Sequence, residues 1–322
     1  MKILLAPVLV TMVVIVTLWT RLRRGPAHPR WSTAAELVLR VTQRLIAAFH
    51  DDLSLVKRLT RFGRLSPWMS ERVDVEAGTL AGMPMEEHRP RNARGPTLLY
   101  FHGGGYAVCN PTTHRELVAQ MAWNCGMRAV ALDYRKAPEA PWPAALEDAL
   151  AAIAALREQG VTEIWLGGDS AGGGLAACSL VAMKQRGLEP VRGAVLFSPW
   201  IDLTEAGQDP ALDSDLDYLS SRELRLYRDA YVQDADASDP TISPVYAELA
   251  GLPPQFVCAG AAETLCDQAE RYVTRCREAG SPIERLVHDG MWHVYPAFSM
   301  LVPEGREALK AVGAWVRSLD DA

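Results

Sequence analysis

The sequence predicts an α/β fold in which a mostly parallel central sheet is flanked by helices. From residue 96 onward, short apolar segments alternate with helical segments of about 10–15 residues, a pattern typical of a parallel sheet covered on both faces. The chain has 322 residues and is 49% hydrophobic, which is enough for a large buried core. No internal repeat or low-complexity segment points to another architecture.

The elements follow one another in a regular order after an irregular start. Residues 25–30 read as a linker, 32–52 as an amphipathic helix with more helix to about residue 62, and 71–78 and 84–90 as a hairpin. The expected strands that follow are 97–102, 127–134, 163–168, 193–200, 255–261 and 283–289. The expected helices are 114–126, 143–160, 170–187, 268–280 and 305–319, and the first two of these end at a glycine. Residues 203–240 break the alternation and predict a helical insertion.

Charge and cysteine content exclude some classes of protein. The net charge is −6 and the sequence pI is about 5.7, so a nucleic-acid partner is not indicated. Six cysteines are scattered without a C-x-x-C pair, which favours reduced, structural thiols and leaves disulfides open.

The N-terminus carries an apolar run without any charge at residues 3–19, followed at once by Arg-Leu-Arg-Arg. We expect an uncleaved membrane anchor over residues 1–24, with a cytoplasmic domain behind it, because the positive charges follow the run. A cleaved signal peptide with export, or a buried or interfacial helix, is the alternative.

The segment LGGDSAGGGLAA, residues 166–177, places one serine among residues with little or no side chain. Gly168-Asp169-Ser170-Ala171-Gly172 matches G-x-S-x-G between an expected strand and an expected helix. Glycines permit a sharp turn there, and the N–H groups at the helix start favour developing negative charge. The pattern predicts Ser170 as a nucleophile, although an ordinary glycine-rich turn is the alternative.

FHGGGY, residues 101–106, follows the first buried strand. Glycine lets backbone N–H groups approach a reacting carbonyl, so this loop predicts an oxyanion hole completed by the N–H of Ala171. The loop lacks the G-x-G-x-x-G spacing and the lysine of phosphate-binding loops. His102 belongs to this loop and is interpreted as structural.

A nucleophilic serine needs a base and a group that orients it. His293 follows the last strand, at the sheet edge where Ser170 is expected, and is the preferred base among seven histidines. The acid should follow the preceding strand, where Glu263 and Asp267 are four residues apart. We favour Glu263 because it lies at the strand end, whereas Asp267 is a routine helix N-cap; the choice stays open.

HGGG upstream of GDSAGG resembles the hormone-sensitive-lipase-like bacterial esterases. The resemblance covers about residues 70–320 and includes DYRKAPEAPWPAALEDA (133–149), SPWIDLT (198–204), SDPTISPVY (238–246) and DGMWHVYP (289–296). It implies the α/β-hydrolase fold with the order serine, acid, histidine. Family members usually carry D-P-L-x-D at the acid, where this chain has Glu263-Thr264-Leu265-Cys266-Asp267.

The resemblance also implies roles and domains. It makes Gly103, Gly104 and Ala171 the oxyanion donors and Asp169 a supporting residue; from their positions in the sequence, we also expect His102 and Asp267 to be supporting residues. It divides the rest of the chain into an N-terminal helical cap segment (25–70) and a catalytic domain (71–322) with a cap insertion (203–240).

The implied activity is serine-dependent hydrolysis of short- to medium-chain acyl esters through an acyl-enzyme, with no metal or cofactor. The partners are a small ester or lipid-like substrate and, through residues 3–19, a membrane; whether the chain forms a homodimer stays open. The alternative is a non-catalytic module that binds a small ligand on the same fold.

Overall fold

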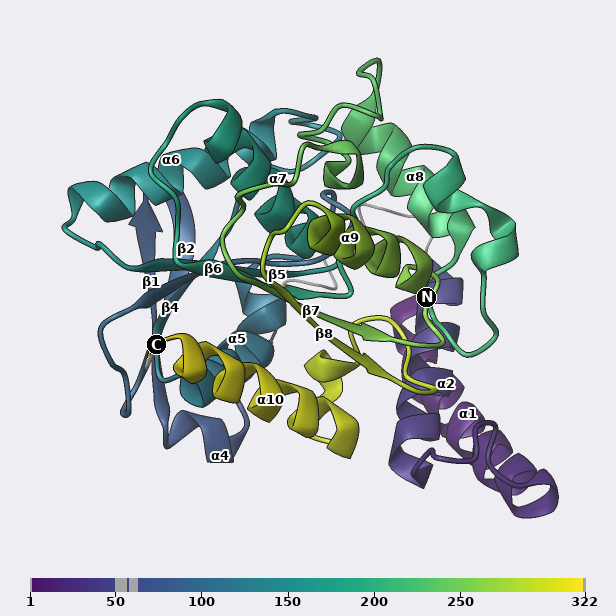
Figure 1. Cartoon of the computed structure of the whole chain (residues 1–322). Coiled ribbons are helices and arrows are strands. Elements are labelled where there is room, and N and C mark those ends of the chain that lie inside the picture. Colours follow the sequence, from purple (N-terminus) through teal and green to yellow (C-terminus); the bar gives the residue numbers. More distant parts are fainter. Residues whose placement is uncertain (1, 50–56, 58–62, 321–322) are drawn as a thin grey trace.

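The central element of the molecule is an eight-stranded sheet with the strand order β1-β2-β4-β3-β5-β6-β7-β8 (Figure 1). This computed structural model describes residues 2–49, 57 and 63–320. β1 pairs with β2, and β2 with β4, in antiparallel fashion, and all the other neighbours are parallel. The predicted fold class is therefore confirmed.

The six predicted strands of the parallel part are present, with ends that differ from the predicted ones by at most three residues. The sheet consists of β1 (Val73–Leu80), β2 (Met83–Pro90), β3 (Thr97–Phe101), β4 (Arg128–Leu132), β5 (Ile164–Asp169), β6 (Gly193–Phe197), β7 (Gln255–Gly260) and β8 (Ile283–His288). β3, β5, β6 and β7 are buried along their whole length, as expected for strands covered on both faces.

Helices cover both faces of the sheet (Figure 1). They are α4 (Pro67–Ser70), α5 (Pro111–Cys125), α6 (Ala144–Glu158), α7 (Ala171–Gln185), α9 (Cys266–Glu278) and α10 (Pro303–Asp320). A further helix, α8 (Ser221–Val232), belongs to the insertion. Side chains of β3 alternate between two cores: Leu99 and Phe101 face the core shared with α6 and α7, whereas Leu98 and Tyr100 face the core shared with α5 and α10.

Two helix predictions need adjustment. α5 begins at Pro111, three residues earlier than expected, because Asn110 caps it and the Asn110 side chain accepts the N–H of Thr113. The insertion contains α8 and two short 3₁₀ turns, Ala206–Gln208 and Pro210–Leu212. The helix expected to continue to residue 62 falls on 50–62, of which only Lys57 lies inside the described residues.

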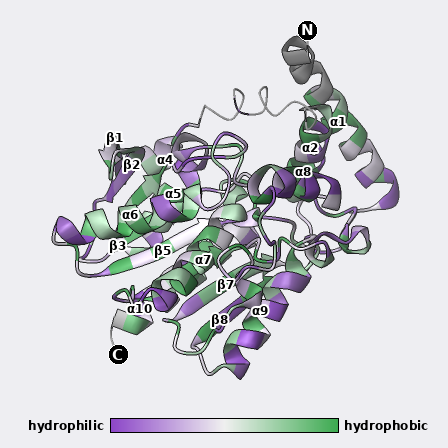
Figure 2. Cartoon of the chain, turned by 90° about the horizontal axis from the view of Figure 1, so that it is seen from above, coloured by the Kyte–Doolittle hydropathy of each residue, from purple (hydrophilic) through white to green (hydrophobic). Residues whose placement is uncertain are grey.

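The N-terminal helices α1 (Lys2–Arg24) and α2 (Thr33–Phe49) form a hairpin at the side of the molecule away from β1 and β2 (Figures 1 and 2). Arg21 of α1 is paired with the buried carboxylate of Glu36 on α2. The expected membrane-spanning segment at 3–19 finds no support: within the described ranges, no helix has the length and apolarity needed to cross a bilayer.

One strand carries a buried histidine that the fold leaves without a hydrogen bond. His88 on β2 is 0% exposed, and neither ring nitrogen has a hydrogen-bond partner among the described residues. Burial lowers the pKa of His88 to about 4, against the opposing effect of Glu86, whose carboxylate lies 3.8 Å away, and with a further lowering from Arg115.

We predict that this histidine makes the fold sensitive to acid. Because its pKa is depressed in the folded state, the unfolded chain takes up the proton first, so stability falls as the pH drops from 6.5 toward 4. Replacing it (His88→Leu) should remove roughly 2–3 kcal/mol of the stability loss between pH 7 and pH 4.5. Urea unfolding at the two pH values measures this difference; equal losses in wild type and variant would contradict it.

Candidate active site

Ser170 lies at a sharp turn between β5 and α7, with a backbone conformation of φ 55° and ψ −123°. A residue with a side chain adopts this region only under strain, and the neighbouring glycines make it feasible. A Cβ at Gly172 would overlap the carbonyl oxygen of Phe101, and one at Gly168 would overlap the backbone of Gly172. The glycines on both sides of the serine are therefore required by close backbone packing.

Ser170 and His293 are in direct contact. His293 lies in the loop after β8, and its Nε2 is 2.9 Å from Ser170 Oγ. Burial lowers the pKa of His293 to about 4, so the imidazole is neutral at pH 7 and its nitrogen can accept a proton. Tyr218 packs edge-on against the imidazole, with 5.8 Å between the ring centroids.

Glu263, and not Asp267, faces the histidine. Glu263 Oε2 lies 3.9 Å from His293 Nδ1 and accepts hydrogen bonds from Ser198 Oγ (2.6 Å) and Gly260 N–H (3.2 Å). Burial raises the pKa of Glu263 well above its usual value, and the nearby Asp217 carboxylate raises it further. The side chain of Asp267 is 57% exposed and pairs with Arg271. No contact with the triad among the described residues supports the expected role of Asp267 at the site.

The expected donor set of the oxyanion hole needs one correction. The N–H of Gly103 donates to Asp169 Oδ1 at 3.2 Å and is not available to a substrate. The N–H groups of Gly104, Gly105 and Ala171 have no partner among the described residues, and the last of these begins α7. Both glycines have positive φ, 114° and 60°, which favours residues without a Cβ.

The carboxylate of Asp169 holds the start of the oxyanion loop in place through hydrogen bonds. Besides the Gly103 N–H, it accepts the hydroxyl of Tyr100 (2.8 Å) and is paired with Nε2 of His114 (3.2 Å). Burial opposes the charge on both partners, but His114 lowers the pKa of Asp169 and Asp169 raises the pKa of His114. His114 was not predicted as a site residue, because nothing in its neighbourhood along the chain marks it as a partner of Asp169.

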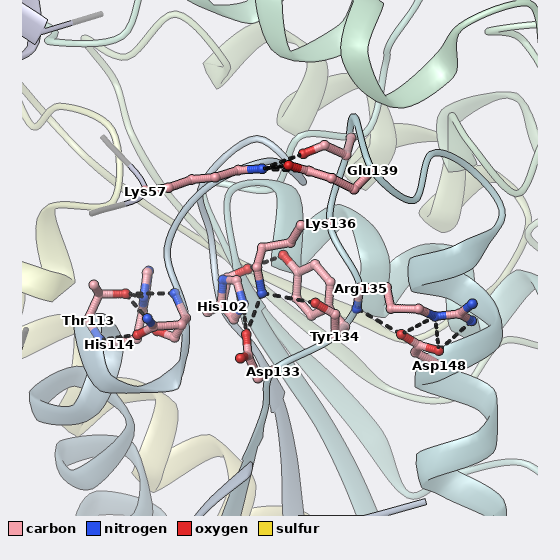
Figure 3. Close-up of polar contacts among 12 residues, drawn as sticks. Lys57, His102, Thr113, His114, Asp133, Tyr134, Arg135, Lys136, Glu139 and Asp148 are labelled. Carbon is pink, nitrogen blue, oxygen red and sulfur yellow. Dashed lines mark hydrogen bonds and ion pairs between the residues drawn. The ribbon is translucent and has the colours of Figure 1, made fainter. Parts of the chain in front are cut away.

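His102 supports the same loop (Figure 3). Its ring stacks on Tyr134 at 4.4 Å, the Tyr134 hydroxyl donates to the His102 carbonyl (2.7 Å), and its Nδ1 lies 2.7 Å from the carbonyl oxygen of Gly103. Burial lowers the pKa of His102 to about 4. Asp133 lies 3.8 Å from His102 Nε2 and also pairs with Lys136. This histidine is thus in contact with the loop and not with Ser170.

The insertion lies over the oxyanion loop. A Cβ at Gly105 would overlap the ring of Tyr227 on α8, and Tyr231 of the same helix stacks on Tyr106 at 3.8 Å. On the other side, the indole N–H of Trp31, just before α2, donates to the carbonyl of Gly290 in the histidine loop (2.8 Å). Both helical segments therefore border the site.

Two further buried residues at the site were not predicted from the sequence. Ser198 lies directly after β6 with φ 44°, and Asp217 lies in the insertion. Ser198 begins the SPWIDLT segment, but nothing in that segment marks its hydroxyl as a partner of Glu263, and Asp217 belongs to no motif. Both residues are recognised only by their partners in space. Within the described part of the chain, the six cysteines form no disulfide.

Comparison with known proteins agrees with this geometry. A family model described as the α/β hydrolase fold matches residues 98–297. An acetyl-hydrolase of Streptomyces hygroscopicus is 38% identical over 233 residues, which are 71% of this chain and 78% of that protein.

Solved structures are similar as well. The hormone-sensitive-lipase homologue EstE7 from a metagenome library has a TM-score of 0.79 at 32% identity, covering 88% of this chain and 98% of that one. The structure of EstE5 soaked with p-nitrophenyl butyrate has a TM-score of 0.76 at 30% identity, covering 96% and 99%. On its motifs, its fold and these similarities, the chain belongs to the hormone-sensitive-lipase-like esterase family of α/β hydrolases.

Proposed function

We propose that the protein is a serine carboxylesterase that hydrolyses short- to medium-chain acyl esters through an acyl-enzyme. The observation that carries the proposal is the 2.9 Å contact between His293 Nε2 and Ser170 Oγ. A serine hydroxyl is a weak nucleophile at neutral pH until a base in contact with it takes its proton. Because burial keeps His293 neutral, the imidazole is in the form that accepts this proton.

In the acylation step, Ser170 Oγ bonds to the ester carbonyl carbon while its proton passes to His293 Nε2. The carbonyl oxygen becomes an oxyanion, which the N–H groups of Gly104, Gly105 and Ala171 stabilise. When the tetrahedral intermediate collapses, the bond to the alcohol oxygen breaks, and His293 gives its proton to the leaving alcohol. The acyl group stays on the serine.

In the deacylation step, His293 takes a proton from water, which attacks the acyl carbon, and the carboxylic acid leaves as the proton returns to Ser170. Glu263 faces the other ring nitrogen and stabilises the imidazolium formed in each half-reaction. Every bond change in this scheme uses groups of the chain, the substrate and water.

Two observations favour a short acyl chain and an apolar substrate. The relatives include a protein named acetyl-hydrolase and one whose crystal was soaked with a butyrate ester. Aromatic rings border the proposed site, with Tyr218 against the catalytic imidazole and Tyr227 against the oxyanion loop.

We predict that Ser170→Ala lowers kcat for p-nitrophenyl butyrate by roughly 10⁴-fold or more, because no nucleophile remains. Ser179→Ala is the matched control. Ser179 lies on α7, the helix that Ser170 caps; its hydroxyl is fully buried and, among the described residues, bonds only to the Leu175 carbonyl. This variant should therefore keep wild-type activity. The ester assay and circular dichroism on both variants test the assignment.

Labelling with a fluorophosphonate separates catalysis from mere binding. The wild type should be modified at Ser170, and Ser170→Ala should not. A folded wild type that binds esters but stays unlabelled and hydrolyses none would contradict the proposal and leave the ligand-binding alternative.

We predict that Glu263→Gln lowers kcat by roughly 10³- to 10⁴-fold, because the imidazolium loses the carboxylate opposite its second nitrogen. Asp267→Asn should leave kcat near the wild-type value, since Asp267 is exposed and its one ion pair within the described ranges is with Arg271. Steady-state kinetics of the two variants decides between the carboxylates. The reverse ranking would assign the acid to Asp267.

A further inference from the structure

Asp217 brings together three backbone N–H groups at one buried carboxylate. It lies in the insertion before α8 and is 4% exposed. Its Oδ1 accepts the N–H of His293 (3.0 Å) and that of Tyr218 (2.7 Å), and its Oδ2 accepts the N–H of Thr264 (2.9 Å). Burial raises the pKa of Asp217 to about 6, and these backbone hydrogen bonds counteract the rise.

Two of these partners belong to the loops that carry the proposed triad. His293 is the base itself, and Thr264 directly follows Glu263. Both loops have left the sheet, so their N–H groups have no strand partner, and a buried N–H without a partner is costly. Charge-assisted hydrogen bonds to a carboxylate are stronger than those between neutral groups. Asp217 therefore fixes both loops at one point.

Other contacts fasten the same region. Thr264 Oγ1 donates to the Leu219 carbonyl (2.7 Å), and Gln43 on α2 donates to the Asp217 carbonyl (2.7 Å). On the opposite side, Ser198 Oγ accepts the N–H of Val294 (2.9 Å) and donates to Glu263. Two consecutive backbone N–H groups of this loop are thus held. Asp217 of the insertion accepts the N–H of His293, and Ser198, directly after β6, accepts that of Val294.

We propose that Asp217 is a positioning residue through which the 203–240 insertion sets the geometry of the Glu263–His293 pair. This inference rests on the proposed function. It assigns the insertion a second task besides covering the oxyanion loop, because its carboxylate orders the acid and the base relative to each other. A displacement of about 1 Å at a reacting group costs up to 10²-fold in rate, so the effect belongs in kcat.

The variant Asp217→Asn keeps the size of the side chain but replaces one acceptor oxygen with an NH₂ donor. That donor would face either the His293 or the Thr264 N–H, so one loop must move. We expect kcat for p-nitrophenyl butyrate to fall by about 10- to 100-fold with KM nearly unchanged. The rate of fluorophosphonate labelling at Ser170 should fall in parallel, since it depends on the same base.

Asp213→Asn is the matched control. Asp213 lies in the same insertion and accepts the N–H (2.6 Å) and hydroxyl (2.9 Å) of Ser221 at the start of α8, away from the triad loops. It should change neither kcat nor the labelling rate, even where it lowers the melting temperature. A merely structural role for Asp217 would make the two variants alike, and that result would overturn the positioning role.

Asp217→Glu gives a second test that does not depend on the folding of the asparagine variant. Both acceptor oxygens remain, but the extra methylene displaces them, so kcat should again fall while KM holds. A kcat equal to that of the wild type would overturn the proposal. If the wild type hydrolyses no ester, the proposed function and this inference both fail. If the wild type is active but Asp217→Asn and Asp213→Asn have equal rates, only the positioning role of Asp217 fails.

Discussion

The contact between His293 Nε2 and Ser170 Oγ depends on one property of the sheet. β5, β7 and β8 run parallel, so the loops after them leave the same edge of the sheet and bring His293 to Ser170, which lies 123 positions earlier in the sequence. The turn and the loops at the ends of these strands then place the individual side chains. The turn at Ser170 raises the hydroxyl above the sheet, and the loop after β8 returns the imidazole to it. An antiparallel strand at either place would send its loop to the opposite edge.

Holding these loops requires buried polar groups, and the structure satisfies most of them with one another. Asp169 serves the oxyanion loop through the Gly103 N–H, the Tyr100 hydroxyl and His114. This explains why Gly103 is not a free donor. Its N–H fixes the start of the loop, and the next two glycines remain available to a substrate. Removing one partner of such a network leaves the others buried and unpaired, which costs more than the bond itself contributes.

The sequence allowed the fold and the proposed triad to be predicted because both are carried by local patterns. Alternating strands and helices define the parallel sheet. Ser170 lies in a motif whose glycines are needed because a Cβ at either position would overlap neighbouring backbone atoms. Choosing Glu263 over Asp267 also rested on local position, at a strand end and not inside a helix. His114 and Asp217 could not be found this way, since their partners are distant in sequence and their own neighbourhoods are unremarkable polar segments. Gly103 was misassigned because three consecutive glycines look alike until Asp169 takes the N–H of the first.

The two halves of the proposed triad are not equally formed. Serine and histidine are within hydrogen-bond distance, whereas Glu263 Oε2 is 3.9 Å from His293 Nδ1, and that nitrogen has no hydrogen-bond partner among the described residues. Catalytic hydrogen bonds often tighten only when substrate is bound. Here Ser198 and Gly260 hold the carboxylate, and Asp217 holds the backbone of the histidine. The charge that develops on the ring during proton transfer favours a closer approach of the two groups, because an imidazolium attracts the carboxylate more strongly than a neutral ring does. The positions of Ser198 and Asp217 therefore matter most during proton transfer, when Glu263 must contact the imidazolium of His293.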